Sequence, residues 1–145
     1  MTMPETLAAK SPAIRLDEQS IIDFAQLFDP QPYHLDREAA DASIFGGLCA
    51  SGWQIAALAS RLTGEALVDA GIAYITTTQV KRMRWLRPSF VDDELIAQVS
   101  IGDSLPHSPV PECQSLDVSV VLKDAKDQTV AEMTCRVAVA KAEKA

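Results

Sequence analysis

The chain has 145 residues, of which 48% are hydrophobic and 23% are charged, and its formal net charge is −7. This length and composition are typical of one globular domain with a buried core, and they exclude an intrinsically disordered chain. The negative net charge argues against a general nucleic-acid binder and against a protein that binds anionic membranes, because both need basic surfaces.

The N-terminal residues and the cysteines bear on the cellular compartment. Residues 1–10 lack the apolar core of a secretory signal peptide. Three isolated cysteines, none of them in a Cys-x-x-Cys pair, favour reduced and buried thiols over disulfides or a catalytic nucleophile; they are Cys49, Cys113 and Cys135. We expect a cytoplasmic protein with a flexible tail over residues 1–11 and a single domain over residues 12–145.

The first half of the chain predicts mainly helices. A short strand over residues 13–16 is followed by Asp17, a typical N-cap for which Ser20 is a competing candidate. Apolar residues at helical spacing then run up to Asp29-Pro30. The helix ends there, because a residue before proline is disfavoured in the α conformation. Residues 36–42 suit a short helix, and residues 50–62 suit a longer helix that is apolar on most of its faces.

The second half of the chain predicts strands. Four segments alternate apolar and polar residues or are rich in β-branched residues: 73–86, 94–101, 116–122 and 130–139. A polar turn at 123–128 joins the last two segments, and three prolines mark a longer loop at 103–114. Helices followed by strands indicate an α+β fold. One apolar helix with four strands favours the hot-dog fold, in which an antiparallel sheet wraps around a central helix. The free edges of such a sheet favour pairing into a dimer.

The strongest candidates for chemistry are Asp29 and His34, which stand five residues apart in a segment stiffened by Pro30 and Pro32. Imidazole titrates near neutral pH, and a carboxylate beside it can hold the other side of one water molecule. Such a pair suits the addition of water to a conjugated double bond, which needs a base for the water and an acid for the α-carbon. A stiff segment fixes the separation of the two groups before substrate arrives.

Spacing alone leaves simpler explanations for these residues open. Asp29 could only end a helix, and His34 could be a surface residue, because Asp and Pro are common in turns. A metal site formed with Asp36 is disfavoured, since no cluster of His or Cys completes it. The second histidine, His107, is expected in a solvated loop between two prolines.

The motif around this pair resembles a known family. The segment Asp29-Pro-Gln31-Pro-Tyr-His34-Leu-Asp36, preceded by Phe24-Ala25, resembles the signature of the MaoC-like dehydratases, which include the (R)-specific enoyl-CoA hydratases. The family pattern, Asp-x-Asn-Pro-x-His-x-Asp, is matched except that Gln31 stands in place of Asn.

Two weaker matches extend the resemblance along the chain. Phe45-Gly46-Gly47 and Ala50-Ser51-Gly52 resemble the family's entry into the central helix, and residues 88–95 resemble its Pro-Val-x-x-Gly-Asp-x-Leu turn. Two further departures occur in these segments. Ser51 stands where His is usual, and Asp92 stands where the turn glycine is usual.

The resemblance implies a carbon–oxygen lyase that interconverts a trans-2-enoyl thioester and a 3-hydroxyacyl thioester. It implies that Asp29 and His34 activate the water and that the backbone N–H of Gly52, at a helix N-terminus, polarises the thioester carbonyl. Ser60 matches a serine of the hydratases, although it could instead line the acyl pocket or bond to its own helix. The reaction would need neither a metal nor an organic cofactor, and a coenzyme A thioester would be the substrate.

A basic run, Lys81-Arg82-Met-Arg84-Trp85-Leu-Arg87, is a candidate contact for the anionic coenzyme A. In a regular strand Arg82 and Arg84 share one face, whereas Lys81, Trp85 and Arg87 share the other. Arg84 and Arg87 are the candidates for substrate binding. A charged edge strand that resists aggregation explains the same residues.

Two other functions stay open on the sequence. Hot-dog thioesterases commonly use an acidic residue or Gln on or beside the central helix; Gln54 is the only such residue early in that helix, and Glu65 lies past its predicted end. A non-catalytic subunit that binds acyl-CoA is the other alternative, and the intact Asp29–His34 pair argues against it. In each case we expect a homodimer or larger homo-oligomer, with no nucleic-acid or membrane partner.

Overall fold

The computed structural model describes residues 8–141. Strand β1 (Ala8–Lys10) pairs antiparallel with strand β4 (Glu94–Leu105), and β2 (Ile14–Arg15) pairs with the start of β4. Residues 8–10 therefore belong to the sheet and not to the flexible tail that we expected over residues 1–11; residues 1–7 lie outside the described part. The sequence did not predict this strand, because three residues are too few to show an alternating pattern. The strand forms by hydrogen bonding to the free edge of β4.

Three helices follow; the first and the third are each capped by an aspartate side chain, and the second begins with a proline. Helix α1 (Glu18–Phe28) begins after Asp17, whose carboxylate accepts from the N–H of Ser20 at 2.8 Å, as the sequence predicted. Helix α2 (Pro32–Leu35) was not foreseen, since the sequence predicted only a stiff segment there. Helix α3 (Arg37–Asp41) confirms the short helix predicted over residues 36–42.

Helix α4 (Gly52–Asp69) is the central helix, capped by Ser51. It continues seven residues beyond the predicted end at residue 62 and stops before Gly71, which has φ +84°. The sequence did not predict this continuation, because polar residues and a glycine follow residue 62. Thr63 is fully buried, and its hydroxyl donates to the carbonyl of Ala59 at 2.6 Å, so a polar side chain fits inside the core.

Four long antiparallel strands complete the predicted sheet: β3 (Tyr74–Trp85), β4, β5 (Cys113–Lys123) and β6 (Thr129–Ala140). The strand order is β1-β4-β5-β6-β3, which leaves β3 at one end of the sheet. The loop predicted from residue 103 is shorter, because a register shift after Ile101 lets Ser104 and Leu105 pair with β5.

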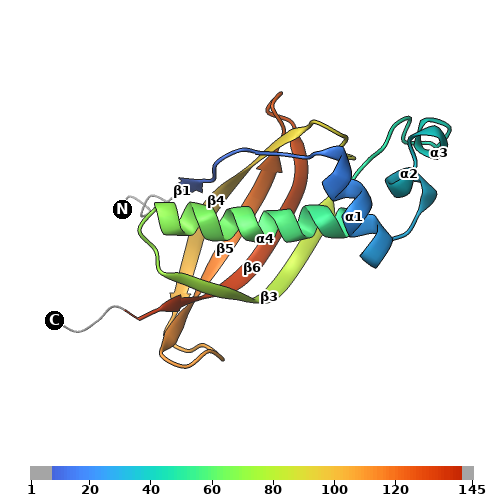
Figure 1. The fold of residues 1–145 in the computed structure, drawn as a ribbon. Helices are drawn as coiled ribbons and strands as arrows, with labels where there is room; N and C mark the ends of the chain where they lie inside the picture. Colours follow the sequence, from blue (N-terminus) through green and yellow to red (C-terminus); the bar gives the residue numbers. More distant parts are fainter. Residues whose placement is uncertain (1–7, 142–145) are drawn as a thin grey trace.

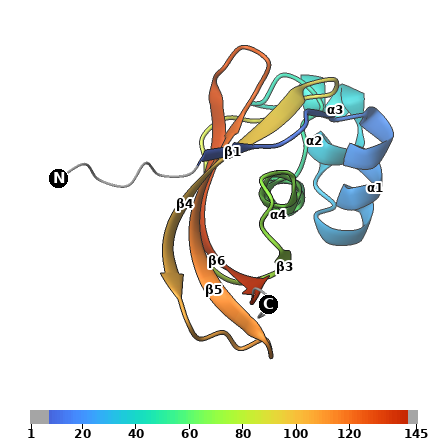
Figure 2. The same cartoon turned by 90° about the vertical axis from the view of Figure 1, so that its left-hand side faces the viewer.

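The sheet wraps around α4, as the hot-dog prediction required. In Figure 2, which views α4 nearly end-on, β4, β5 and β6 curve around one side of the helix and α1, α2 and α3 lie on the other. Figure 1 shows that these three helices gather at the N-terminal end of α4. Between helix and sheet lies a core of fully buried side chains that includes Leu16, Ile21, Leu62, Leu67, Leu95, Leu122 and Val137. Among residues 8–141, no helix is both long enough and apolar enough to span a membrane.

Candidate active site

Asp29 and His34 are positioned by the end of one helix and the short helix after it. Asp29 is the C-cap of α1, where its N–H donates to the carbonyl of Ala25 at 2.9 Å. Pro32 begins α2, a position that suits proline because the first N–H of a helix has no intrahelical acceptor. The single turn of α2 then brings His34 back, so that its Nε2 lies 3.5 Å from Oδ2 of Asp29.

The imidazole of His34 has a defined tautomer. Its Nδ1 lies 2.6 Å from the carbonyl oxygen of Cys49, and a carbonyl can only accept, so Nδ1 carries a hydrogen. In the neutral ring Nε2 therefore holds the lone pair, and Nε2 is the atom that faces Asp29. The side chain of His34 is 8% exposed and that of Asp29 is 25% exposed, so the pair is shielded but reachable.

Ser51 connects this pair to the central helix. Its hydroxyl lies 2.7 Å from Oδ2 of Asp29 as a donor, and it accepts the N–H of Trp53 at 3.2 Å as the N-cap of α4. The sequence singled out Ser51 only as a departure from the family pattern. A contact between side chains 22 positions apart has no signal in the sequence, so this partner of Asp29 was missed.

Gly52 and His34 line the same cavity, of about 310 Å³, together with mostly apolar side chains such as Tyr33, Phe45 and Ile55. Gly52 is the first residue of α4, so its N–H has no acceptor one turn earlier. The indole of Trp85, which was not singled out as a site residue, donates to the carbonyl of Gly52 at 2.6 Å.

A side chain at position 52 would disturb this arrangement. A Cβ added to Gly52 would lie 3.0 Å from the indole nitrogen of Trp85. The indole, which also lines the cavity, would have to shift to make room for a side chain at this position.

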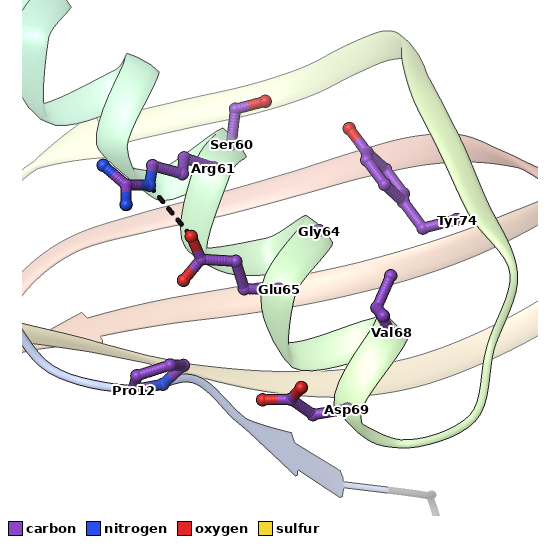
Figure 3. A pocket seen from close by; sticks show the side chains of 8 residues that line it. All are labelled: Pro12, Ser60, Arg61, Gly64, Glu65, Val68, Asp69 and Tyr74. Atoms are coloured by element: carbon purple, nitrogen blue, oxygen red, sulfur yellow. Dashed lines mark hydrogen bonds and ion pairs between the residues drawn. The ribbon is translucent and has the colours of Figure 1, made fainter.

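Ser60 lies in a different place. It lines a second cavity, of about 520 Å³, beside the C-terminal half of α4 (Figure 3). There the ring of Tyr74 packs so closely on Gly64 that an added Cβ would lie 2.8 Å from it. Eight helical residues rise about 12 Å, and Ser60 is not among the residues that line the cavity of His34 and Gly52. The structure thus does not bring Ser60 together with the Asp29–His34 pair.

The thioesterase candidate Gln54 also lies apart from His34, and so does Glu65, which falls inside α4 and not past its end as predicted. Gln54 is buried, lines neither of these two cavities, and its Oε1 has no hydrogen-bond partner among the described residues. Glu65 lines the second cavity, where its carboxylate accepts from Arg61 at 2.9 Å (Figure 3).

The two candidate arginines for substrate binding differ in position. Arg87 lines the cavity with His34, and its guanidinium donates to Gln128 at 3.4 Å. Arg84 does not line that cavity, and its guanidinium lies 3.9 Å from the carboxylate of Glu132 on the surface. Only Arg87 therefore stands beside the Asp29–His34 pair.

The faces predicted for the basic run are wrong in one respect. Lys81 and Trp85 were expected on one face, but the amine of Lys81 lies 3.1 Å from Asp117 of β5, whereas Trp85 reaches Gly52 of α4. β3 has register shifts against β6, one of them between Val80 and Arg82. Such a bulge adds a residue and breaks strict alternation, which the sequence did not reveal.

The other polar residues singled out in the sequence have structural partners. The carboxylate of Asp36 accepts from the N–H of Ala39 at 3.1 Å, as the N-cap of α3. Among residues 8–141, no three side chains of His, Cys, Asp or Glu are grouped closely enough to hold a metal ion. The carbonyl of His107 accepts from the hydroxyl of Ser115 at 2.5 Å, in the loop before β5.

All three cysteines are free and buried, which confirms the predicted burial of these side chains. Burial raises the pKa of the Cys49 thiol, although its Sγ lies 3.8 Å from Nδ1 of His34. Burial likewise raises the pKa of Cys135 to about 11. Both thiols thus stay protonated at neutral pH, and the backbone of Cys49, not its sulfur, is the part that holds His34.

The chain is similar to proteins of one family. A family model described as the MaoC like domain matches residues 2–108. The uncharacterized protein YdeM of Bacillus subtilis is 34% identical over 97 residues, which are 67% of this chain and 68% of YdeM. The crystal structure of the MaoC-like dehydratase from Rhodospirillum rubrum is 30% identical, with a TM-score of 0.81 over 98% of this chain and 96% of that one.

A further structure, the (R)-hydratase from A. caviae involved in PHA biosynthesis, is 23% identical and shares the fold, with a TM-score of 0.69 over 94% of this chain and 96% of that one. The sheet wrapped around the central helix defines a hot-dog protein. The chain belongs to the MaoC-like dehydratase family.

Proposed function

We propose that this protein interconverts a trans-2-enoyl thioester and a 3-hydroxyacyl thioester, with Asp29 and His34 as the catalytic pair. The observation that carries the proposal is the 3.5 Å between Oδ2 of Asp29 and Nε2 of His34, with Nδ1 of His34 held by a carbonyl. Two acceptors this close can bind the two hydrogens of one water molecule, which leaves an oxygen lone pair free to attack carbon.

The two proton transfers that hydration requires can both be made by this pair. As the water oxygen bonds to the β-carbon, one of its hydrogens passes to the pair and negative charge moves to the thioester oxygen. A proton from the pair then bonds to the α-carbon, so that both side chains return to their starting protonation. Dehydration follows the same steps in reverse, and the transfers use only these two side chains.

Gly52 supplies the group that the developing negative charge needs. Its N–H is the first of α4, where the helix dipole favours negative charge, and Gly52 lines the cavity with His34. In this proposal the thioester carbonyl faces that N–H and the acyl chain lies against the apolar lining. Arg87 is positioned to meet an anionic carrier such as coenzyme A, and Arg84, on the surface, is a weaker candidate.

A direct assay tests the proposal. Purified protein is mixed with trans-2-enoyl-CoAs of increasing chain length, and loss of the conjugated thioester is followed by its ultraviolet absorbance. We expect turnover with at least one chain length, and a drop of about 10²–10⁴-fold in Asp29→Asn. Asn can still accept from Ser51, so the fold should persist.

Asp36→Asn is the matched control, because this carboxylate caps α3 in the same motif and Asn is an equally good cap. It should keep turnover within about threefold of the wild type, because the carboxylate of Asp36 is bonded to the N–H of Ala39, whereas that of Asp29 faces His34. Full turnover in Asp29→Asn would refute the catalytic assignment, and no turnover of any enoyl-CoA by the wild type would refute the substrate class.

We further propose that two copies of the chain associate along β3. This strand ends the sheet, and its side chains Ile75 and Val80 are 51% and 52% exposed. An exposed apolar strand edge is a template for pairing with another strand. Light scattering on a size-exclusion column should give twice the mass of the chain for the wild type, and about one chain mass for Val80→Asp.

The same substitution at Leu27, which is 75% exposed on α1, serves as the control and should leave the dimer intact. A monomeric wild type would refute the proposed association. A dimer that persists in Val80→Asp would place the interface elsewhere.

A further inference from the structure

The hydroxyl of Ser51 has a fixed direction. Ser51 is fully buried, and its Oγ lies 2.7 Å from Oδ2 of Asp29 and 3.2 Å from the backbone nitrogen of Trp53. The N–H of Trp53 can only donate and an ionised carboxylate can only accept. The single hydroxyl hydrogen must therefore point at Asp29 while the oxygen caps α4.

The carboxylate of Asp29 depends on this contact for its orientation. Among residues 8–141, Ser51 is the only side chain that donates a hydrogen bond to it, since Nε2 of His34 stands farther away at 3.5 Å. The contact is made to Oδ2, the same oxygen that faces His34. Loss of the hydroxyl would free the carboxylate to rotate away from the imidazole.

Ser51 also sets the distance between the carboxylate of Asp29 and the N–H of Gly52. The N–H of Gly52 belongs to the peptide group that joins Ser51 to Gly52, so the proposed oxyanion donor and the support of Asp29 are covalent neighbours. The hydrogen bond from Ser51 therefore keeps the carboxylate of Asp29, the proposed water-binding group, at a fixed position relative to the start of α4.

We propose that Ser51 is a positioning residue, whose hydroxyl orients the Asp29 carboxylate toward His34 and toward the N-terminus of α4. This inference rests on the hydratase function proposed above and adds to it the residue that stands where the family pattern usually has His. Ser51 does not act on substrate itself; it acts through Asp29. Its removal should therefore lower kcat and leave KM nearly unchanged.

The test compares Ser51→Gly with the wild type, using the enoyl-CoA that the wild type hydrates fastest. Glycine is nearly as good an N-cap as serine, so Ser51→Gly removes the donor to Asp29 and largely keeps the helix start. We expect kcat to fall about 10–100-fold, because a catalytic group displaced by about 1 Å loses up to 10²-fold in rate. KM should change less than about threefold.

A double-mutant cycle separates positioning from a general structural effect. In the Asp29→Asn background, Ser51→Gly should change kcat by less than about twofold, because the carboxylate through which Ser51 acts is gone. An equal fold-loss in both backgrounds would show that Ser51 acts independently of Asp29 and would overturn the proposal.

A second pair of variants decides the matter if Ser51→Gly fails to fold. Ser51→Thr keeps both hydrogen bonds and Ser51→Ala keeps neither, so Thr should retain kcat within about threefold and Ala should lose it. Equal kcat values in folded Thr and Ala variants would overturn the proposal. An inactive wild type would instead refute the hydratase function. If the wild type is active and Ser51→Gly is fully active as well, the hydratase function stands and only the proposed role of Ser51 is refuted.

Discussion

Nδ1 of His34 lies 2.6 Å from the carbonyl oxygen of Cys49, and this contact joins helix α2 to the segment that enters α4. The contact determines which imidazole nitrogen faces Asp29, because the carbonyl requires a hydrogen on Nδ1. It also satisfies a backbone carbonyl next to the buried side chain of His34. The structural and proposed catalytic roles of His34 therefore reside on different nitrogen atoms.

These two roles can be separated by substitution. The amide of Asn can reach where Nδ1 stands, so His34→Asn should keep the bond to Cys49, whereas His34→Ala leaves that carbonyl without a partner. Hydration should fall about 10²–10⁴-fold in both variants. Urea unfolding should find the Ala variant less stable than the Asn variant by about 1–3 kcal/mol. Wild-type turnover in His34→Asn would contradict the role of Nε2.

The thiol of Cys49 should be dispensable for turnover, in contrast to its carbonyl. Its pKa is raised by burial, so it is protonated and a poor nucleophile at neutral pH. We expect Cys49→Ala to hydrate enoyl-CoA within about fivefold of the wild type, since the backbone contact to His34 remains. Steady-state kinetics at pH 7 check this. A loss as large as that of Asp29→Asn would show that the sulfur takes part in the reaction.

Asp92 occupies a turn position that favours glycine. Its φ is +71°, in the left-handed region, and its side chain pairs with Arg15 at the surface. Replacement by Gly or by Ala removes the ion pair in both cases, but only Gly adopts this φ without a steric cost. Asp92→Gly should therefore be more stable than Asp92→Ala by about 1 kcal/mol in urea unfolding. Equal stabilities would contradict the backbone explanation.

Asp117 makes the stability of the sheet depend on acid pH. Hydrogen bonds from Arg136 first, and also from Lys81, lower the pKa of its carboxyl below the ordinary value of 3.8. A carboxyl with a lowered folded pKa stabilises the protein above its unfolded pKa, and this stability is lost as pH falls through the folded pKa.

Asp117→Asn should accordingly lower the free energy of unfolding by about 1 kcal/mol at pH 7. The difference from the wild type should shrink as pH falls below about 4. Urea unfolding over this pH range measures the effect, with Asp103→Asn, an exposed carboxyl on β4, as the control that should change little. A difference that is independent of pH would exclude the charge of Asp117 as its cause.

The sequence by itself determined the kind of fold and the motif at its centre. Local signals were sufficient there: Asp17 caps α1, Asp29-Pro30 ends it, and alternation of apolar and polar residues marks the long strands. Asp29 and His34 are close in sequence, so a single turn of helix between them was enough to bring them together.

Only the tertiary structure decided which distant residues join that pair. The hydroxyl of Ser51, the carbonyl of Cys49 and the indole of Trp85 reach the site from segments that pack together only when the sheet closes around α4. Their contacts cross 15 to 33 positions of sequence, and no local propensity encodes them. The bulges of β3 moved Lys81 to the face opposite Trp85, and the pitch of α4 carried Ser60 into another cavity. Periodicity predicts the elements, whereas the geometry of the site depends on how those elements pack.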